Sequence, residues 1–129
     1  MLQIVNAGRK SLADYSRAVI QKSTREGFGL TVSEALWKAR PVVAGNAGGI
    51  VTQIEDGRTG WLVDSAEACA AACLEILADP AAACVRALAG KEHVRQRFLT
   101  PRLVRDWLVL FNRQLGNDVG HAGIEILAA

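Results

Sequence analysis

The sequence predicts an α/β fold in which helices cover both faces of a parallel β-sheet. Three short apolar runs predict strands within 17–21, 42–44 and 61–63, and helical periodicity follows each of them. Strands that are apolar throughout are typical of parallel sheets buried on both faces. A Rossmann-like doubly wound sheet has about six strands, so we expect the C-terminal half of such a sheet, followed by C-terminal helices.

Glycine and proline mark the limits of the first expected helices. Gly8 weakens a helix over 4–14, and Pro41 stops a second helix over 31–40. One or two helical turns are expected over 50–55, after a glycine-rich loop.

Capping residues predict where three further helices begin. The first runs to about residue 78, and the last, over about 101–115, carries a broad apolar face. The two later helices begin where a capping residue precedes a proline. The capping positions are Asp64 or Ser65, Asp79 before Pro80, and Thr100 before Pro101.

The composition is that of a soluble globular domain. The 129 residues suit one domain over 1–115 and a flexible tail over 116–129, and half of them are hydrophobic. A net charge of +2 without a basic stripe argues against nucleic-acid binding. No apolar run approaches the ~20 residues of a transmembrane helix, and no signal-peptide core is present, so a cytoplasmic location is expected.

The cysteines allow two interpretations. Cys69 and Cys73 lie four residues apart on an expected helix, which permits a metal-binding pair. We favour the other interpretation, in which they are small side chains packed within an alanine-rich helix. Neither His93 nor His121 has the spacing of a metal ligand to them, so no metal site is expected.

The stretch from Glu26 to Glu34 carries the most chemical information. Gly27 and Gly29 allow a ligand to approach the backbone closely. The first amides of the following helix have no partner within that helix, which favours phosphate or hydroxyl oxygens. This loop and the glycine-rich loop at 45–49 both follow strands, and ligands bind beyond the carboxyl ends of parallel strands. Carboxylates there are suited to the vicinal diols of sugars and riboses.

A purely structural interpretation also fits these residues. Thr31 and Glu34 have the spacing of a capping box, in which Glu34, in the first turn of its helix, satisfies a backbone amide. Glu26 alone would then be an exposed loop acid beside turn glycines. From the residues alone this interpretation is favoured for Glu34, because two glutamates eight residues apart are a weak pattern.

The longer run from Lys22 to Ile50 resembles the signature of family-four retaining glycosyltransferases, which have the GT-B fold. It contains a serine, an E-G-F-G core, seven residues between two glutamates, a P-V-V strand and a G-G loop, and D-G and T-G-W-L-V follow. The segments E-A-L-W-K and V-A-G-N are most similar to trehalose synthase-like members, which join a nucleotide-diphosphate glucose to glucose. The resemblance covers residues 5–115.

The resemblance implies a role for each matching residue. Glu26 is expected to act as the catalytic carboxylate beside the transferred sugar, and Glu34 to hold the ribose hydroxyls. Such enzymes bind a nucleotide-diphosphate sugar, need no metal or other cofactor, retain the anomeric configuration, and bind the acceptor in a separate N-terminal domain. The other donor-binding residues implied are Gly27, Phe28, Gly29, Leu30, Gly48 and Gly49.

Departures from the family pattern bear on activity. The Arg and Lys that neutralise the leaving diphosphate would precede residue 1, and Lys22 and Arg25 do not occupy their positions. Val51 stands where many members have proline. We therefore expect a donor-binding fragment that is inactive alone. The alternatives are a non-catalytic remnant, a subunit that complements a separate N-terminal half, and an unrelated flavodoxin-like module.

Two apolar surfaces predict association. The strand near Val19 would present an unpaired apolar edge, and the last helix carries more apolar surface than so small a domain covers. Self-association, or binding to a separate partner chain, is therefore expected.

Overall fold

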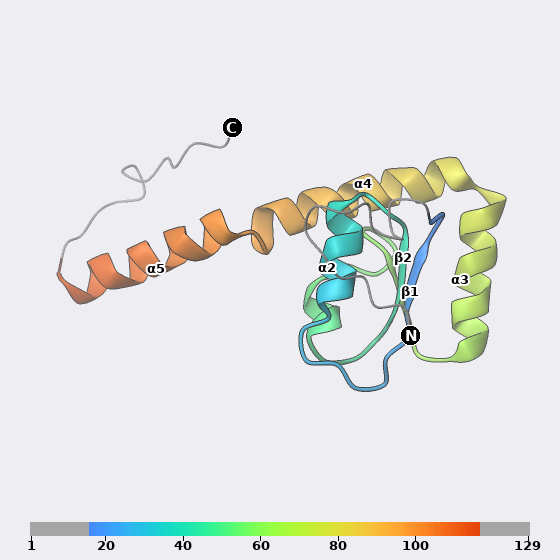
Figure 1. Ribbon diagram of the computed structural model, residues 1–129, viewed down its shortest axis with the longest axis horizontal. Coiled ribbons are helices and arrows are strands. Elements are labelled where there is room, and N and C mark those ends of the chain that lie inside the picture. The colour runs from blue at the N-terminus through green and yellow to red at the C-terminus, as the bar shows by residue number, and fades with distance from the viewer. Residues whose placement is uncertain (1–15, 117–129) are drawn as a thin grey trace. The chain divides into compact units, whose positions relative to one another are not determined.

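The computed structural model describes residues 16–116, and within them three strands form one parallel sheet (Figure 1). The strands are β1 (Val19–Gln21), β2 (Val42–Gly45) and β3 (Trp61–Val63), in the order β1-β2-β3. Val19 pairs with Val42, and Val43 pairs with Trp61. The predicted strands and their parallel arrangement are confirmed, but the first strand is shorter than expected and is not fully buried, since Ile20 is 51% exposed. The helix expected over 4–14 lies outside the described residues.

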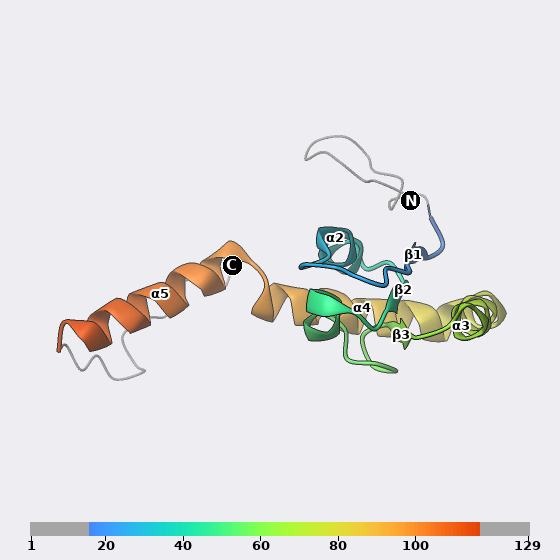
Figure 2. The same ribbon diagram turned by 90° about the horizontal axis from the view of Figure 1, so that it is seen from below.

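Helices cover both faces of this sheet. α2 (Leu30–Trp37) packs on β1 and β2, while α3 (Ala66–Ala78) packs on β2 and β3 from the opposite side (Figures 1 and 2). A short 3₁₀ helix, η1 (Gly48–Thr52), follows β2, and α4 (Pro80–Arg97) follows α3. All four residues of β2 are buried, as expected for the central strand of a sheet covered on both faces.

The core between the sheet and α3 is mostly aliphatic. Val43, Val63 and Trp61 pack with Ala72 and Ile76 of α3. Trp61 also has a polar contact with α3, in which its Nε1 donates a hydrogen bond to a Glu75 carboxylate oxygen at 3.0 Å. This packing fixes β3 against α3.

Two of the predicted helix caps are confirmed and one is wrong. Ser65 accepts a hydrogen bond from the amide of Ala68 at 3.0 Å, so Ser65 rather than Asp64 caps α3. Asp79 accepts from the amide of Ala82 at 2.9 Å at the start of α4. Thr100, by contrast, is the first residue of its helix, and no side chain caps that end.

α2 ends earlier than the sequence predicts, at Trp37 instead of residue 40. The amide of Ala39 donates to the carbonyl of Leu36 at 2.8 Å, and the amide of Arg40 donates to the carbonyl of Ala35 at 3.0 Å. These two bonds form a Schellman motif, with Ala39 in the left-handed region at φ 51°. Glycine usually occupies that position, so the sequence did not mark this helix end.

The described residues fall into two compact units, divided between Arg95 and Gln96. The second unit contains α5 (Thr100–Gln114), in which no residue is buried. Trp107 and Phe111 stack on each other with ring centroids 5.5 Å apart. The exposed apolar side chains of this segment are Leu103, Val104, Trp107, Leu108, Leu110, Phe111 and Leu115. Within residues 16–116, no single helix is long and apolar enough to cross a membrane.

We expect the purified chain to self-associate, because α5 exposes an apolar face and β1 pairs only with β2 among residues 16–116. Light scattering during size-exclusion chromatography should give a mass of at least twice that of one chain. The double substitution L108E/F111E should lower that mass. A stable monomer at micromolar concentration in the unaltered chain would contradict this expectation.

Candidate functional site

The loops that follow the strands meet at the carboxyl edge of the sheet. Residues 22–29 join β1 to α2, and residues 46–47 join β2 to η1. Lys22 links this loop to the end of β3, since its Nζ donates to the Asp64 carbonyl oxygen at 3.2 Å. We call residues 26–30 the donor loop, because the sequence predicts that they bind the nucleotide-sugar donor.

The donor loop and η1 lie backbone against backbone. The amide of Gly49 donates to the carbonyl of Gly27 at 2.8 Å. A Cβ on Gly48 would lie 1.7 Å from the Glu26 carbonyl oxygen, and one on Gly49 would lie 2.5 Å from the Gly27 oxygen. Any larger residue would push the two segments apart. The absence of side chains at Gly48 and Gly49 therefore allows the donor loop to pack directly on η1.

The Glu26 carboxylate is held by its own loop. Its oxygens accept hydrogen bonds from the Gln21 side-chain amide at 3.2 Å, the Gly27 amide at 3.1 Å and the Ser23 hydroxyl at 3.5 Å. These three hydrogen-bond donors come from the end of β1 and the loop that follows it. The carboxylate is half-buried and therefore keeps a defined position at the carboxyl edge.

The start of α2 differs from the predicted capping box. Gly29 is the N-cap, with φ at 86°, and no side chain caps the helix. The capping-box interpretation of Thr31 and Glu34 is therefore wrong. Glu34 is the fifth residue of α2 rather than part of its first turn, because the helix begins at Leu30. The Glu34 side chain is exposed and forms no hydrogen bond to any residue in 16–116.

Three consecutive amides at the start of α2 have no partner. Within residues 16–116, the N–H groups of Gly29, Leu30 and Thr31 form no hydrogen bond. The positive end of the helix dipole lies at the same place. This arrangement suits an anionic oxygen or a hydroxyl.

The outer side of the donor loop is open. A Cβ on Gly27 would meet no atom within 4 Å. Phe28 and Leu30 are exposed, with 42% and 68% of their surfaces accessible. Leu30 and Glu34 lie one turn apart on the same face of α2, and helical side chains lean towards the N-terminus. Glu34 is therefore on the face of α2 that continues from the exposed Leu30.

The structure thus brings most of the predicted site residues together. Glu26, Gly27 and Phe28 contact the backbone or side chains of the segment from Gly48 to Gln53. Glu34 lies further along α2, one helical turn after Leu30. Sequence reasoning missed Gln53, which is fully buried beneath the loop. The one sign of its burial in the sequence is that Gln53 falls on the same helical face as the apolar residues Ile50 and Ile54.

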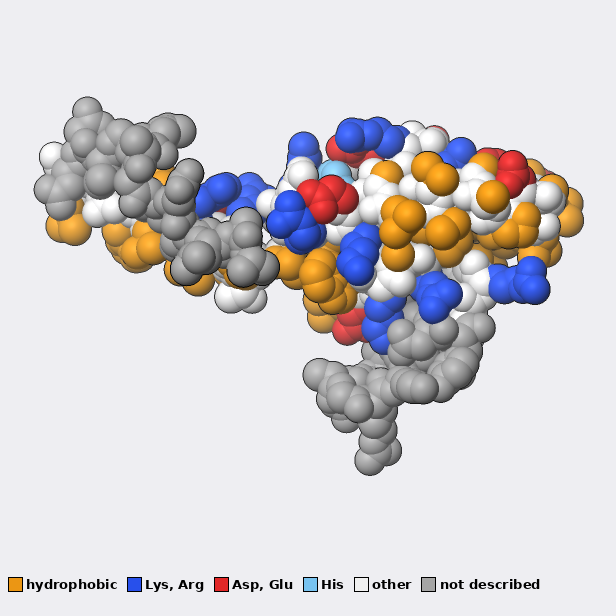
Figure 3. Space-filling model, turned by 90° about the horizontal axis from the view of Figure 1, so that it is seen from above, with side chains coloured by type: hydrophobic (Ala, Val, Ile, Leu, Met, Phe, Trp, Pro, Cys, Tyr) orange, Lys and Arg blue, Asp and Glu red, His pale blue; other side chains and the backbone are white. Residues whose placement is uncertain are grey.

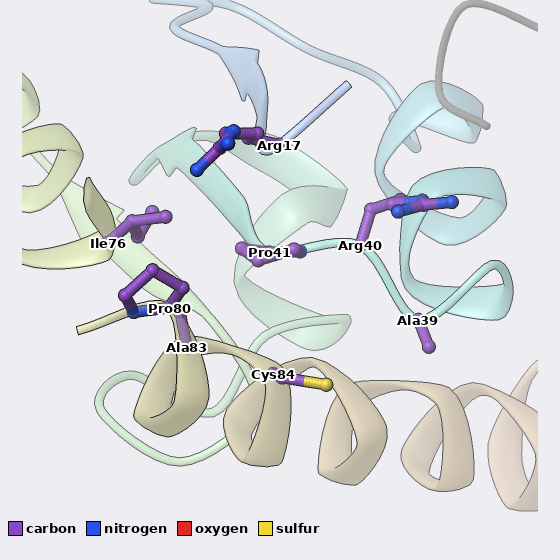
Figure 4. Close-up of a pocket in the computed structure, with 8 residues that line it drawn as sticks. All are labelled: Arg17, Ala39, Arg40, Pro41, Ile76, Pro80, Ala83 and Cys84. Carbon is purple, nitrogen blue, oxygen red and sulfur yellow. The ribbon is translucent and has the colours of Figure 1, made fainter. Parts of the chain in front are cut away.

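A cavity of about 200 Å³ lies at the opposite edge of the sheet, where the strands begin (Figure 4). It is lined by residues before β1 and β2 and by α3 and α4, including Arg17, Pro41 and Cys84. Figure 4 shows the Arg17 and Arg40 side chains extending in different directions, so the two cations do not converge on one point. This cavity is separate from the donor loop.

The cysteines pack as the second interpretation predicts. Cys69 and Cys73 are half-buried on α3 and pack against the core. Burial raises the pKa of the Cys73 thiol, and the neighbouring Cys69 raises it further, so the thiol stays protonated at neutral pH. No group of three His, Cys, Asp or Glu side chains within residues 16–116 is arranged to hold a metal.

The face shown in Figure 3 carries Lys and Arg side chains, fewer Asp and Glu side chains, and a group of apolar side chains. Several of the cations are paired locally. Arg95 forms two hydrogen bonds of 2.8 Å with the Glu92 carboxylate, which raises the pKa of Arg95. At the start of α3, the backbone amides and Ser65 lower the pKa of the Glu67 carboxyl.

The family of the chain follows from comparison with known proteins. Residues 7–92 match the model of the glycosyl transferases group 1, and the chain belongs to this family. It is 60% identical over 107 residues to a trehalose synthase from Rubrobacter xylanophilus, a match that covers 83% of this chain and 25% of that protein. The chain therefore spans about a quarter of the length of the curated relatives it matches.

Solved structures agree with this assignment. Sucrose-phosphate synthase from Thermosynechococcus elongatus has a TM-score of 0.72 and 30% identity, covering 81% of this chain and 27% of that one. Anabaena HepE in complex with UDP has a TM-score of 0.70 and 26% identity, covering 79% and 29%. Such neighbours are GT-B glycosyltransferases, so the predicted fold class and the resemblance to trehalose synthases are confirmed.

Two alanine substitutions test the backbone contact beneath the donor loop. Gly49→Ala should lower the free energy of unfolding by about 1–3 kcal/mol, because the new methyl would overlap the Gly27 carbonyl. Gly27→Ala is the matched control and should change it by less than ~0.5 kcal/mol, because its methyl points into open space. Urea unfolding measures both values, and equal effects would contradict the contact.

Proposed function

We propose that this chain binds a nucleotide-diphosphate sugar, with glucose as the sugar, at the carboxyl edge of its sheet. In this proposal it supplies the donor site for retaining transfer to a sugar acceptor such as glucose. The proposal rests on the polar groups that the donor loop and the start of α2 present. A half-buried carboxylate, three free amides and an exposed carboxylate follow one another along a single loop and helix start.

Each group suits one part of such a donor. The three free amides of Gly29, Leu30 and Thr31 suit diphosphate oxygens, since they add hydrogen bonds to the helix dipole. The Glu26 carboxylate suits the hydroxyls of the transferred sugar. The Glu34 carboxylate, further along α2, suits the two ribose hydroxyls. In this proposal Gly27 and Phe28 line the sugar, and Gly48 and Gly49 set the depth of the site.

The comparisons support the choice of ligand. HepE was solved with UDP and also with UDP-glucose, and the trehalose synthases are named for a product that contains glucose. The family assignment makes nucleotide-sugar binding the expected chemistry of this edge. In this proposal the acceptor is bound by another part of the enzyme, because this chain spans only about a quarter of the length of its trehalose synthase relatives.

We further propose that the isolated chain is inactive. Departure of a diphosphate needs cations at the leaving group. Two cations lie between β1 and α2. Lys22 is engaged at the Asp64 carbonyl, and Arg25 is an exposed side chain two residues before the Gly27 amide. Acceptor positioning also contributes many orders of magnitude to a transfer rate.

A second candidate function is that of a non-catalytic remnant or of a subunit that completes a separate N-terminal acceptor half. The exposed apolar face of α5 and the β1 edge favour the subunit over the remnant, because both are surfaces that a partner chain would cover. Co-expression with the acceptor half of a trehalose synthase, followed by an assay for stable co-purification, distinguishes this candidate.

Donor binding is tested by titrating UDP-glucose and ADP-glucose into the isotope-labelled chain and following backbone amide shifts by NMR. We expect saturable shifts centred on residues 27–34 and 45–49, because the free amides would acquire partners. Glu34→Ala should weaken binding about tenfold through loss of the ribose contact. Glu92→Ala, an exposed glutamate on α4, is the control and should leave binding unchanged. A well-dispersed spectrum without shifts at millimolar ligand would overturn the proposal.

Turnover is tested separately with the purified 129-residue chain, UDP-glucose or ADP-glucose, and glucose. No disaccharide should form above the uncatalysed background, for the reasons of charge and acceptor positioning given above. Chromatography with amperometric detection measures the product. Formation of trehalose or another glycoside by the chain alone would show that the inactivity proposal is wrong.

A further inference from the structure

Gln53 is a fully buried polar side chain beneath the donor loop. It follows η1 directly, and its exposed fraction is 0%. Its Nε2 donates a hydrogen bond to the carbonyl oxygen of Phe28, and its Oε1 accepts one from the hydroxyl of Ser33 at 2.5 Å. One amide side chain therefore joins the donor loop to α2. Both of its polar ends are satisfied, as a buried amide requires.

The hydrogen bond to Phe28 fixes a peptide plane. The peptide between Phe28 and Gly29 is planar and trans, so its C=O and N–H point in opposite directions. Because the Phe28 carbonyl points at Gln53, the Gly29 N–H must point away from the core. That N–H is the first of the three free amides at the start of α2.

The neighbouring peptide is fixed in the same sense. The Gly27 carbonyl accepts from the amide of Gly49 at 2.8 Å, so two successive carbonyls of the loop face the segment after β2. Of these two contacts, only the one to Phe28 depends on a side chain. Gly29 also packs against the side chains of Gln53 and Ile50, because a Cβ at Gly29 would lie 3.6 Å from Gln53 Nε2 and 2.9 Å from Ile50 Cγ1.

We propose that Gln53 is a positioning residue that holds the Phe28–Gly29 peptide so that the Gly29 amide faces the anionic oxygens of the donor. This inference rests on the proposed function, because it assigns the orientation of the same site. Ser33 stabilises the orientation of the Gln53 side-chain amide. Its hydroxyl donates to Oε1 and so leaves Nε2, rather than Oε1, facing the carbonyl of Phe28.

The substitution Gln53→Glu tests this positioning through its pH dependence. An ionised carboxylate has no proton to donate and would repel the Phe28 carbonyl, so the peptide should lose its orientation. A protonated carboxyl can donate and should restore it. Relative to the unaltered chain, UDP-glucose binding should be weakened at least about tenfold at pH 8, and the deficit should shrink as the pH falls through the pKa of the introduced carboxyl.

Two further variants separate positioning from folding. Gln53→Met keeps a similar volume but can donate at no pH, so its deficit in binding should not depend on pH. Ser33→Ala removes only the bond to Oε1 and is the milder change, so it serves if the substitutions at position 53 prevent folding. In every variant the amide resonance of Gly29 without ligand reports the peptide orientation directly. We expect it to shift in Gln53→Met and, at pH 8, in Gln53→Glu.

The outcomes distinguish this inference from the proposed function. If the unaltered chain binds no nucleotide sugar but the Gly29 resonance shifts with the protonation of Gln53→Glu, the proposed function fails and the positioning stands. If the unaltered chain binds and all folded variants bind equally at every pH, the inference is wrong. A Gly29 resonance that none of the substitutions moves would also overturn it.

Discussion

The close contact between two backbone segments shapes this site. The donor loop after β1 and the short helix η1 after β2 approach so closely that neither Gly48 nor Gly49 has room for a Cβ. Parallel strands bring the two segments to the same edge, and the absence of side chains lets them touch. The Gly27 carbonyl is then bonded to Gly49, and the Phe28 carbonyl to Gln53. Because those carbonyls face inward, the amides that follow them face outward.

Helix α4 packs against the segments that flank this contact. Gly90 of α4 lies against Leu36 of α2 and the carbonyl of Thr59, where a Cβ would be only 2.7 Å from each. The imidazole of His93 lies 3.2 Å from a Glu55 carboxylate oxygen, and the Glu55 amide donates to the Thr59 hydroxyl at 2.8 Å. α2 and the turn after η1 therefore share one anchor on α4. The core thus holds the position of the loop that we propose as the donor site.

Much of the fold could be predicted from local pattern. Apolar runs such as Val42–Val43 mark buried parallel strands, and Ser65 and Asp79 mark helix starts, because each signal lies within a few residues. The end of α2 could not be predicted, since Ala39 adopts a left-handed conformation that alanine rarely takes. The start of α2 was misjudged for a related reason, as Gly29 caps it without any side-chain bond.

The sequence marks the residues of the candidate site but not the contacts that hold them in place. Glu26, the glycines and Glu34 stand out in the sequence, and the structure places them along one loop and helix. Gln53 did not stand out, because its role depends on a carbonyl 25 residues earlier in the chain. Long-range contacts of this kind leave no periodic signal. The exposed face of α5 follows its apolar spacing, although the spacing does not specify what covers it.

Hydrogen exchange of individual amides in the ligand-free chain tests this account most directly. The Gly49 amide should exchange slowly, at a rate close to that of buried amides in β2, because it is bonded to the Gly27 carbonyl. The amides of Gly29, Leu30 and Thr31 should exchange quickly, since they have no partner within residues 16–116. If Gly49 exchanged as fast as Leu30, the loop would not be held before a ligand arrives, and the account would be contradicted.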